Sequence, residues 1–578
     1  MPGVSRVRGW RLVLLASLIA GALPLTSSLA GASTWTPAQP LATSLNLGGY
    51  AQVLSVSCAG PGQCVAGGYY EDVNNTSQAL IVNEVNGVWG APTTLAGSLN
   101  MSGAQVTSVA CDPSGHCVAG GYYEDASTTT FAFVADEVNG NWVITTLPSS
   151  LDPNGSQVNA VACEASGHCV AGGYYETAGV HVQAFVMDEV NGTWGAPSTL
   201  TDGSNQALGD LAGSNGYAQV NAVACDGVGY CVAGGYYYDA STIQHAFVVD
   251  EVGGVWSRAT SLAQASRVNA TTTLTSLACD PSGHCVAGGM LNDAGSTYQA
   301  FVADEVGGLW TTTPIATSLN TGGSAETNSV ACDPSGHCVA GGMLNDAGST
   351  YQAFVADEVN GTWSATTVAA SLNGGGNATV WAVACSAGQC EAGGYYDATG
   401  STYGAFIADE VNGVWAASPV ATSLNARGGA GVTALTCSAG QCLAGGNYVD
   451  STGRTQAFIT QNEVTPGRLA GLSLTRSHTT VSASWTPNGS DSYTCTLMYG
   501  YSSPSSFHVT TTSGGCAFYG VSPTQSVGVR VVATSAGVSS APVTAFVDGQ
   551  ASITCVRNSA HRVVTGASPR CPAGWRRR

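Results

Sequence analysis

The 578-residue chain contains no lysine, and only 9% of its residues are charged. All 16 basic residues are arginines, set against 36 acidic residues, so the formal net charge is −20. Residues 33–464 carry a net charge of −30, whereas residues 465–578 carry +7. Because phosphate binding relies on Lys and Arg, the acidic part argues against nucleic acid and anionic lipid as partners. The basic C-terminal end is a candidate contact for anionic cell-wall polymer, and the alternative is a solvated charged end.

Long apolar runs are also scarce. The one at the N-terminus, "LVLLASLIAGALPL", follows Arg6, Arg8 and Arg11 and precedes the small residues "AGA" at 30–32. This pattern is typical of a secretory signal peptide over residues 1–32, the alternative being an uncleaved membrane anchor. No later run reaches the roughly 18–20 apolar residues that span a bilayer. We therefore expect an exported monomer, secreted or held at the cell surface by other means.

The twenty cysteines fall into ten local pairs. An oxidising compartment favours disulfides, whereas zinc fingers and ribbons need a second ligand pair nearby. Most pairs flank a short Gly-containing loop between strand-like runs, which suits a bridge across the end of a hairpin. The predicted disulfides are Cys58/Cys64, Cys111/Cys117, Cys163/Cys169, Cys225/Cys231, Cys279/Cys285, Cys332/Cys338, Cys385/Cys390, Cys437/Cys442, Cys495/Cys516 and Cys555/Cys571.

Eight of these pairs belong to a repeat of about 53 residues, which predicts its architecture. Residues 106–147 contain four strand-like runs, here called a to d: "VTSVAC", "CVAGGYY", "FAFVADEV" and a run that opens at Trp142. Runs c and d join through Asn139-Gly140, a strong signal for a two-residue hairpin. Four short antiparallel strands repeated at this period are typical of one blade of a β-propeller.

Tryptophans show how the repeats close. They open run d at Trp35, Trp89, Trp142, Trp194, Trp256, Trp310, Trp363 and Trp415. Trp35 precedes any other strand, whereas the last unit, 432–464, has runs a to c but no Trp-bearing run. The N-terminal segment is therefore expected to supply the outer strand of the last blade and so remove its open edge. The fold class that follows is all-β, with an eight-bladed β-propeller over 33–464 and a disulfide in each blade.

The double glycine that ends run b, followed by a Trp that opens run d, resembles the kelch repeat over roughly 33–464. The chain departs from kelch by placing Asp, as at Asp136 and Asp304, where an aromatic residue often stands, and by adding the cysteine pair. Its Cys-x-Val-Ala-Gly-Gly style also resembles uncharacterised repeat proteins secreted by high-GC bacteria. Neither resemblance implies a particular activity.

Residues 465–547 resemble a fibronectin type III domain, a β-sandwich, through "TVSASWTPNGSDSYTCTLMYG" and "GVSPTQSVGVRVVATSAGVSSAPVTA". The resemblance implies that Trp485 is the core tryptophan of the second strand and that Pro523 belongs to a corner between strands. Val527 stands where the family usually has Tyr. Residues 548–578 form a short basic tail with a disulfide loop.

Repeated polar residues invite catalytic or metal interpretations. Asp-Glu pairs such as Asp136-Glu137 precede the c–d turn, but adjacent strand residues point to opposite faces. A structural role at blade contacts is the preferred interpretation, and calcium shared between blades is the alternative. We expect no other cofactor. His116 and its equivalents alternate with Gln and Tyr, which favours hydrogen bonds within the turn. The Tyr pairs after Gly-Gly become Met-Leu in two repeats, which favours apolar packing over sugar stacking.

Function is expected where the repeats differ, on the rim shared by the d–a and b–c loops. The d–a loop 200–219 is longer than its equivalents. The candidate binding residues on this rim are Asp202, Asn205, Asp210, Arg258, Arg267, Trp381, Arg427 and Arg454. They suit a glycan or a protein partner of a non-catalytic binding or adhesion protein.

Local enzyme signatures are missing. The sequence has no GxSxG, HExxH or Gly-rich phosphate loop, and it lacks the Asp-box turns of sialidases, so no catalytic residue is assigned. The alternative is a carbohydrate-active hydrolase or lyase, because a pair of acidic residues on different blades would leave no local motif. A surface adhesin or spacer without a defined small ligand is the third interpretation.

Overall fold

The computed structural model describes residues 33–578 with short gaps at turns and linkers. The gaps are 139, 149–153, 191, 214–215, 228, 263–269, 293–296, 349, 360, 387, 399–401, 412, 463–469, 478, 487–491, 500–502, 524, 536–537, 540–542, 548–550, 558–559 and 567–569. The predicted signal peptide, Arg267 and Glu463 therefore lie outside the described residues. The described elements are strands and one 3-10 helix, η1 (Leu208–Asp210). In this part of the chain no helix is long and apolar enough to cross a membrane.

Residues 33–462 form eight antiparallel sheets, numbered I to VIII in chain order, and each has a first, second, third and outer strand. The first strands are β2 (Ala51–Gly60), β7 (Ala104–Cys111), β11 (Ser156–Cys163), β15 (Ala218–Cys225), β19 (Thr271–Cys279), β23 (Ala325–Cys332), β27 (Ala378–Ser386) and β31 (Gly431–Ser438). The second strands are β3 (Gln63–Glu71), β8 (Cys117–Glu124), β12 (His168–Glu176), β16 (Tyr230–Tyr238), β20 (Cys285–Asn292), β24 (Cys338–Asn345), β28 (Gln389–Ala398) and β32 (Gln441–Val449).

The remaining strands complete each sheet. The third strands are β4 (Ser77–Val85), β9 (Thr130–Val138), β13 (Val182–Val190), β17 (Gln244–Val252), β21 (Tyr298–Val306), β25 (Tyr351–Val359), β29 (Thr402–Val411) and β33 (Thr455–Gln461). The outer strands are β5 (Val88–Trp89) with β6 (Thr93–Leu95), β10 (Asn141–Thr146), β14 (Ser198–Thr199), β18 (Thr260–Ser261), β22 (Leu309–Pro314), β26 (Thr362–Thr367), β30 (Val414–Val420) and β1 (Gln39–Pro40).

The outer strands are less regular than the sequence predicts. In sheets III and IV, Trp194 and Trp256 make only isolated bridges, and the strands β14 and β18 follow later. In sheets I and III the Trp is followed by Gly-Ala-Pro. Because Pro has no N–H to donate, it interrupts the ladder at this edge position.

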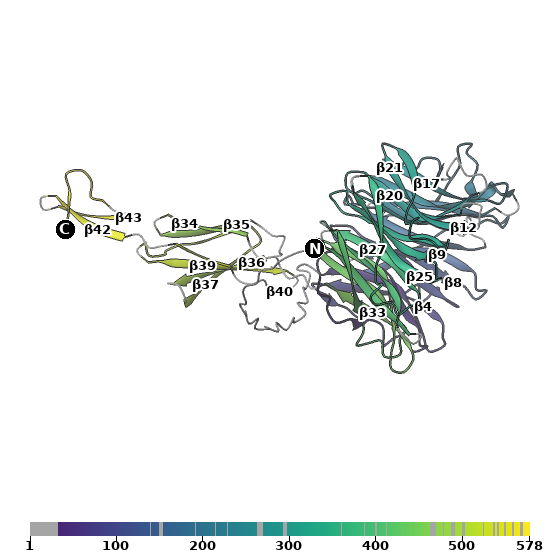
Figure 1. Cartoon of the computed structure of the whole chain (residues 1–578), viewed down its shortest axis with the longest axis horizontal. Coiled ribbons are helices and arrows are strands. Elements are labelled where there is room, and N and C mark those ends of the chain that lie inside the picture. Colours follow the sequence, from purple (N-terminus) through teal and green to yellow (C-terminus); the bar gives the residue numbers. More distant parts are fainter. Residues whose placement is uncertain are drawn as a thin grey trace, which may run out of the picture.

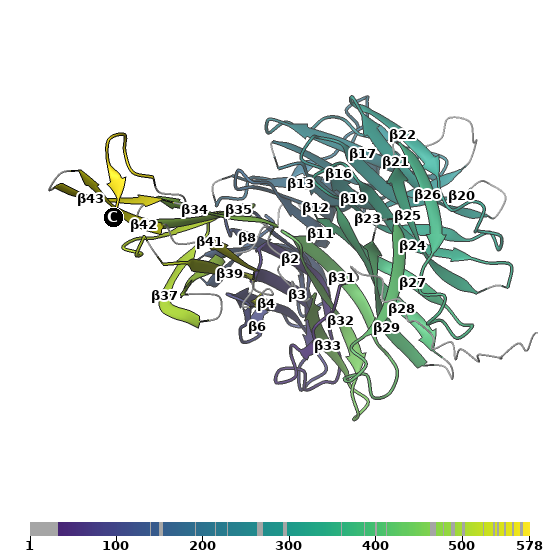
Figure 2. The ribbon, with the colours of Figure 1, turned by 60° about the vertical axis from the view of Figure 1, so that its left-hand side comes forward.

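The eight sheets close into a ring, which gives a propeller-like all-β fold (Figures 1 and 2). Each first strand contacts the first strand of the next sheet, and β31 of sheet VIII contacts β2 of sheet I. The outer strand of sheet VIII is β1, so the prediction that the N-terminal segment completes the last sheet is confirmed. Trp35 bridges Asn462, whereas the equivalent tryptophans pair with a Glu. In sheet VIII, Asn462 therefore occupies the position that Glu holds in the other seven sheets.

Close approach between sheets requires the first glycine of each Gly-Gly pair. A Cβ on Gly341 of sheet VI would lie 2.6 Å from Val380 Cγ1 and 2.7 Å from Val383 Cγ1 of sheet VII. The same contact closes the ring, since a Cβ on Gly445 of sheet VIII would lie 2.5 Å from Val53 Cγ1 of sheet I. The valines of these contacts belong to the apolar clusters between the sheets. The repeat therefore packs glycine against branched side chains at each junction.

Each first strand has a β-bulge, and in six of the eight sheets the bulge residue makes a polar contact with the next sheet. In sheet II, Thr107 stands at the bulge and its Oγ1 donates to the Val158 carbonyl at 2.7 Å. In sheet VIII, Thr433 Oγ1 donates to the Val53 carbonyl across the ring closure at 2.5 Å. Equivalent bonds start from Asn159, Asn221, Thr275 and Asn328. Such bonds satisfy carbonyls that the bulge leaves outside the ladder.

The predicted local features of the hairpins are present. All ten predicted disulfides form, and the repeat pairs lie directly opposite each other on first and second strands, as at Cys111 and Cys117. In sheet I the turn between third and outer strands has positive φ at Asn86 (54°) and Gly87 (76°), as the Asn-Gly signal predicts.

The disulfides of the repeat lie at hairpin ends, but they are largely covered by protein. The second cysteine of each pair is buried, which applies to Cys64, Cys117, Cys169, Cys231, Cys285, Cys338, Cys390 and Cys442. Cys64 belongs to the apolar cluster between sheets VIII and I, and it bonds Cys58 with a Cα–Cα distance of 4.0 Å. Cys442 bonds Cys437 at 4.1 Å, and its main-chain N–H donates to Asn462 Oδ1 at 2.8 Å.

The pairs thus bridge the turn end of each hairpin, as predicted, and their second cysteines are buried there. Cys64 and Cys442 are only 3% and 2% exposed, because the neighbouring sheet covers the end of each second strand. Both are structural core residues rather than groups that a ligand could reach. The bridges therefore strengthen the sheet junctions as well as the hairpins.

The C-terminal strands form three further sheets. One contains β34 (Ala470–Ser477), β35 (Thr480–Thr486) and β38 (Gly515–Phe518). The second contains β36 (Ser492–Tyr499), β37 (Ser503–Thr511), β39 (Val527–Ser535), β40 (Val538–Ser539) and β41 (Val543–Val547). Both contribute to one core around Trp485, and the Cys495–Cys516 disulfide links them. The tail pairs β42 (Ala551–Arg557) with β43 (Ala560–Gly566) and β44 (Arg576–Arg577), and Cys555–Cys571 ties it.

The glycine contact between sheets gives a stability prediction. Gly341→Ala should destabilise the protein by about 1–3 kcal/mol, because the added methyl group overpacks the junction with Val380 and Val383. Gly60→Ala is the matched control, since a Cβ there meets nothing within 4 Å. Thermal or denaturant unfolding of both variants measures the difference. Equal stability of the two variants would contradict this account of the junction.

Candidate functional site

The clearest break in the repeat lies in sheet VII. Trp381 occupies the bulge position of β27, where six other sheets place the Thr or Asn that bonds the next sheet. Its side chain stays 39% exposed. The ring rests over Gly431 of sheet VIII, where a Cβ would lie 2.6 Å from Trp381 Cζ3. The chain has therefore exchanged a structural hydrogen bond for an accessible indole, and the neighbouring sheet provides the space.

Two tyrosines of the same sheet extend this surface. The Tyr395 ring centroid lies 4.8 Å from that of Trp381, and the Tyr403 ring crosses Tyr395 edge-on at 5.6 Å. Tyr403 is 46% exposed. We call Trp381, Tyr395 and Tyr403 the aromatic cluster. Exposed aromatic groups that gather in one place are typical of binding surfaces.

A hollow of about 370 Å³ adjoins the cluster and is lined by Tyr403, Asn425 and Arg427, among others. Arg427 donates from Nε to the Ser451 carbonyl at 3.1 Å, so it rests on the turn between β32 and β33. Arg454 ends that turn, where its main-chain N–H bonds Asp450 Oδ1 at 3.1 Å. Three of the predicted binding residues, Trp381, Arg427 and Arg454, therefore gather around sheets VII and VIII.

The other predicted residues lie around the long loop before sheet IV. Asp202 Oδ1 accepts main-chain N–H groups of Ser204 and Gln206, and Asn205 has a positive φ of 64° in the same turn. The Ser204 hydroxyl bonded to Asp202 lowers the pKa of that carboxyl. Arg258 Nη1 donates to the Gly203 carbonyl at 3.3 Å.

Asp210 completes this second group from the end of η1. Its Oδ1 accepts Gln183 Nε2 at 2.6 Å and His181 Nδ1 at 2.8 Å. Asp202 thus holds a turn of the loop, whereas Asp210 fastens the loop to β13, next to the buried Leu208. A binding role for Asp202, Asn205, Asp210 and Arg258 stays a prediction.

The tyrosine pairs divide into two roles. The second tyrosine packs inward, as expected for apolar packing: Tyr70 and Tyr175 are buried and bond Thr94 and Thr199, each at 2.6 Å. The first tyrosine is half-buried and stacks at the sheet end, as Tyr69 does on Tyr50 at 5.7 Å. The apolar-packing interpretation therefore fits only one member of each pair. The sequence signal for Tyr395 was its place in a repeated pair, which did not separate the two roles.

The Asp-Glu pairs act structurally, as predicted. Asp136 accepts the indole N–H of Trp194 in the next sheet at 3.0 Å. The same bond joins Trp256 to Asp188, Trp363 to Asp304, Trp415 to Asp357 and Trp35 to Asp409. The adjacent Glu caps the following turn, as Glu358 does by accepting the Gly361 N–H at 3.1 Å. The two carboxylates of a pair therefore diverge, and shared calcium stays the untested alternative.

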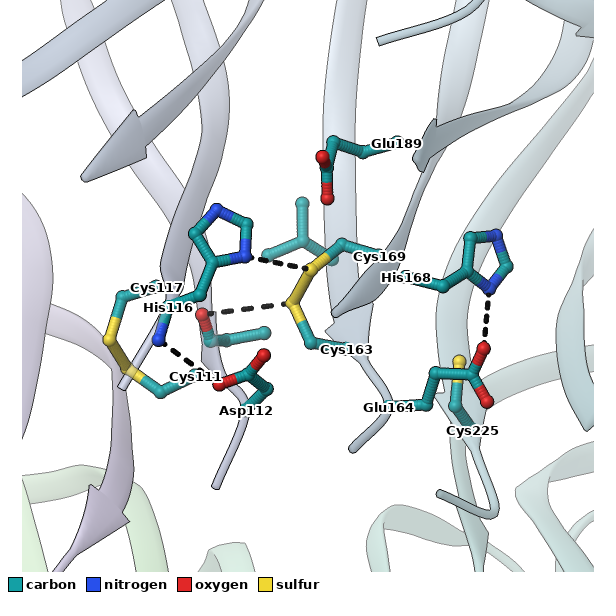
Figure 3. Close-up of a disulfide and its surroundings, with 12 residues drawn as sticks. Cys111, Asp112, His116, Cys117, Cys163, Glu164, His168, Cys169, Glu189 and Cys225 are labelled. Carbon is teal, nitrogen blue, oxygen red and sulfur yellow. Dashed lines mark hydrogen bonds and ion pairs between the residues drawn. A yellow bond between two sulfur atoms is a disulfide. The ribbon is translucent and has the colours of Figure 1, made fainter. Parts of the chain in front are cut away.

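The repeated histidines face the next sheet rather than their own turn alone. The His116 main chain bonds Asp112 in the turn at 3.0 Å, but its ring nitrogen Nδ1 lies 3.9 Å from the sulfur of Cys169 (Figure 3). Glu189 of the same neighbouring sheet faces this ring. The prediction of turn bonding thus holds for the backbone of His116 and not for its ring. In the next repeat the ring also bonds its own turn, since His168 Nδ1 lies 2.9 Å from Glu164 Oε1. Because Cys169 is disulfide-bonded, one His and one Glu remain, fewer ligands than a zinc site uses.

Comparisons with known proteins add little. No family model matches the chain, and no curated protein matches it. Among solved structures, an ulvan lyase is 11% identical with a TM-score of 0.38, over 67% of this chain and 95% of the lyase. The lectin BP39L of Burkholderia pseudomallei is 14% identical with a TM-score of 0.35, over 64% of this chain and 100% of the lectin. An α-L-arabinanase of Penicillium chrysogenum is 9% identical with a TM-score of 0.32, over 61% and 92%. At these values the likeness says nothing about the activity of this chain.

The junction of sheets III and IV gives a pH prediction. A hydrogen bond to Asp188 raises the pKa of His168 to about 9, against burial, which lowers it. A raised histidine pKa stabilises the fold fully below pH 6.5, and this stabilisation is lost as the pH rises through about 9. Asp188→Asn should lower the pKa of His168 and remove this loss. NMR titration of the imidazole measures the shift.

The control for this prediction is Asp304→Asn, which removes the equivalent carboxylate in sheet V and should leave the titration of His168 unchanged. If His168 titrates at the same pH in Asp188→Asn as in the unaltered protein, the hydrogen bond to Asp188 does not set its pKa.

Proposed function

We propose that residues 33–464 form an exported, kelch-like, eight-bladed β-propeller that binds an extracellular glycan at the aromatic cluster without catalysing a reaction on it. The eight sheets, their closed cycle of contacts and the N-terminal outer strand support the architecture. A fibronectin type III-like domain over 465–547 is supported by two antiparallel sheets that share the core around Trp485. The basic tail, residues 548–578, is proposed to contact cell-wall polymer.

The exposed indole of Trp381 carries the binding proposal. Flat aromatic rings bury large apolar area at low entropic cost, and polar groups beside them fix the orientation of a ligand. Trp381 supplies the ring, Tyr395 supports it at a tilt, and the hollow beside Tyr403 supplies polar atoms from Asn425 and Arg427. A sugar ring has an apolar C–H face and a hydroxyl rim, which matches this arrangement.

The hydrolase or lyase alternative requires an accessible pair of carboxyl groups. Among the described residues, Glu391 and Asp409 lie directly opposite each other on β28 and β29, but they are 0% and 1% exposed. A polymer does not reach them in this structure.

The test uses the protein from residue 33 to 578, incubated with insoluble polysaccharides and bacterial cell walls, with pelleted protein and released reducing ends measured together. We expect saturable binding without new reducing ends. Trp381→Ala should weaken binding about thirtyfold, since truncating a central aromatic anchor costs roughly 2 kcal/mol.

Tyr403→Ala and Tyr298→Ala form a matched pair of variants. Both tyrosines stand at the start of a third strand and are exposed, but Tyr298 lies in a sheet that has Met290 in place of Tyr395. Only Tyr403→Ala should reduce binding. New reducing ends abolished by a single Asp or Glu substitution would replace this proposal with the enzyme. Binding to a protein component of the cell wall alone would replace the glycan.

A further inference from the structure

The N-terminal segment meets an unusual pair of carboxyl groups in sheet VII. Glu391 on β28 pairs with Asp409 on β29. In every other sheet that has Asp at this third-strand position, the opposite residue is Val, namely Val118, Val170, Val232, Val286 and Val339. The chain has therefore placed a second buried acid at one junction of the ring only, and this is the junction that the N-terminal segment completes.

Glu391 is buried and incompletely satisfied. Its Oε1 accepts the Ser33 hydroxyl at 3.2 Å and Gln389 Nε2 at 3.3 Å. Its Oε2 finds no hydrogen-bond donor among the described residues, although the whole side chain is 0% exposed. Burial, followed by the contact with Asp409, raises the pKa of Glu391. A buried carboxyl group beside a second one is costly unless a proton or a cation neutralises the pair.

In the described part of the chain, the contacts of the pair include no basic side chain. They are neutral: Trp35 Nε1 donates to Asp409 Oδ1 at 3.2 Å, and Gln389 Nε2 donates to Ser33 Oγ at 2.9 Å. The remaining charged group near Glu391 is Glu410, which adds repulsion. The chain also has no lysine that could reach the site.

A cation for this pair of carboxyl groups arises if the signal peptide is cleaved where the sequence predicts. Removal of residues 1–32 after "AGA" makes Ser33 the first residue. Its new α-amino group is separated from the Oγ that contacts Glu391 only by Cα and Cβ. An α-ammonium group carries three N–H donors and one positive charge, which is the chemistry that two buried carboxyl groups lack.

We propose that Glu391 and Asp409 form a receptor for the α-ammonium group of a processed N-terminus at Ser33. Leader removal hydrolyses the peptide bond between Ala32 and Ser33, water supplying the atoms of the new carboxylate and amine. Glu391 then releases its proton to solvent and pairs with the ammonium group. The pair fastens β1, the outer strand of sheet VIII, so that ring closure depends on correct processing. This inference rests on the proposed export and not on glycan binding.

The absence of lysine makes the test direct, because the α-amine is the only primary amine of the protein that begins at Ser33. Intact mass first establishes the N-terminus of exported protein. An amine-reactive acetylating reagent then labels a single site, and mass spectrometry gives its rate. An ordinary α-amine has a pKa of about 7.7–8.0, and each unit by which an ion pair raises it slows labelling at neutral pH about tenfold. We expect labelling of the folded protein at least about tenfold slower than in urea.

Glu391→Val introduces the residue of the equivalent position in sheets II to VI and is therefore expected to fold. It should restore fast labelling. Asp357→Asn removes the matching acid of sheet VI, where no chain end arrives, and should leave the slow labelling unchanged. Equally fast labelling of folded and unfolded protein would overturn the proposal, as would a mature N-terminus away from Ser33.

A form extended by one residue, Ala32-Ser33, gives an independent measurement without any core substitution. Without the ammonium group in place, Glu391 must stay protonated, so its raised pKa makes the stability of this form fall as the pH rises above the ordinary carboxyl range. The thermal midpoint of the extended form should therefore drop relative to the Ser33 form as the pH rises from weakly acidic to weakly basic. Parallel pH profiles of the two forms would also overturn the proposal. Unchanged glycan pelleting in either form separates this result from the binding test.

Discussion

The structure depends on one contact, the glycine of each second strand against the branched side chains of the next first strand. It brings neighbouring sheets so close that a methyl group at Gly341 or Gly445 has no room. The interface is apolar and brings main chain close to side chains of the next sheet. Packing of this kind needs no charged groups, which agrees with a chain that has only 9% charged residues. The contact must recur at the closure between sheets VIII and I. That closure also requires an outer strand from the other end of the chain, supplied by β1.

Hydrogen bonds and disulfides reinforce this packing. Some join neighbouring sheets, and others join two strands of one sheet. The bulge residues bond the next first strand, and the Trp–Asp bonds join an outer strand to the preceding sheet. The disulfides tie the hairpin of first and second strand, each contributing roughly 2 kcal/mol on a chain-entropy model. Because these devices repeat, they are scaffold. A sheet that lacks one of these repeated contacts therefore differs from the scaffold at an identifiable residue.

Two such departures lie in sheet VII. At Trp381 the chain gives up a bond to the next sheet and gains an accessible indole. At Glu391 it replaces a buried Val with a carboxyl group that faces Asp409 and Ser33. Residues that are unfavourable in their local environment, but that the surrounding structure tolerates, are expected at functional positions. The first departure is accessible to solvent and suits a ligand, whereas the second is buried and suits the chain's own terminus.

The sequence by itself determined the repeated four-stranded units and the way in which the two ends of the chain close the last of them. Local periodicity, the Asn-Gly turns, the cysteine spacing and the unmatched Trp35 predicted the strands, the disulfides and the N-terminal outer strand, because each depends on residues near one another or on a count. The kelch and fibronectin type III resemblances stay proposals. The alternation of side chains along a strand also predicted that the Asp-Glu pairs diverge.

Only the tertiary structure decided which side chains meet across a junction. Register shows that Asn462 faces Trp35 where the other sheets have Glu, and that the His116 ring turns toward the next sheet. It buries Cys64 and Cys442 and gathers Trp381 and Arg427 around two sheets. It also commits the polar atoms of the long loop to its own turn and to the neighbouring strand β13. Glu391 was visible in the sequence as "CEAGG" among "CVAGG" repeats, but its partners Asp409 and Ser33 lie on another strand and at the far end of the chain. Such contacts depend on sheet twist and ring closure, which no local pattern encodes.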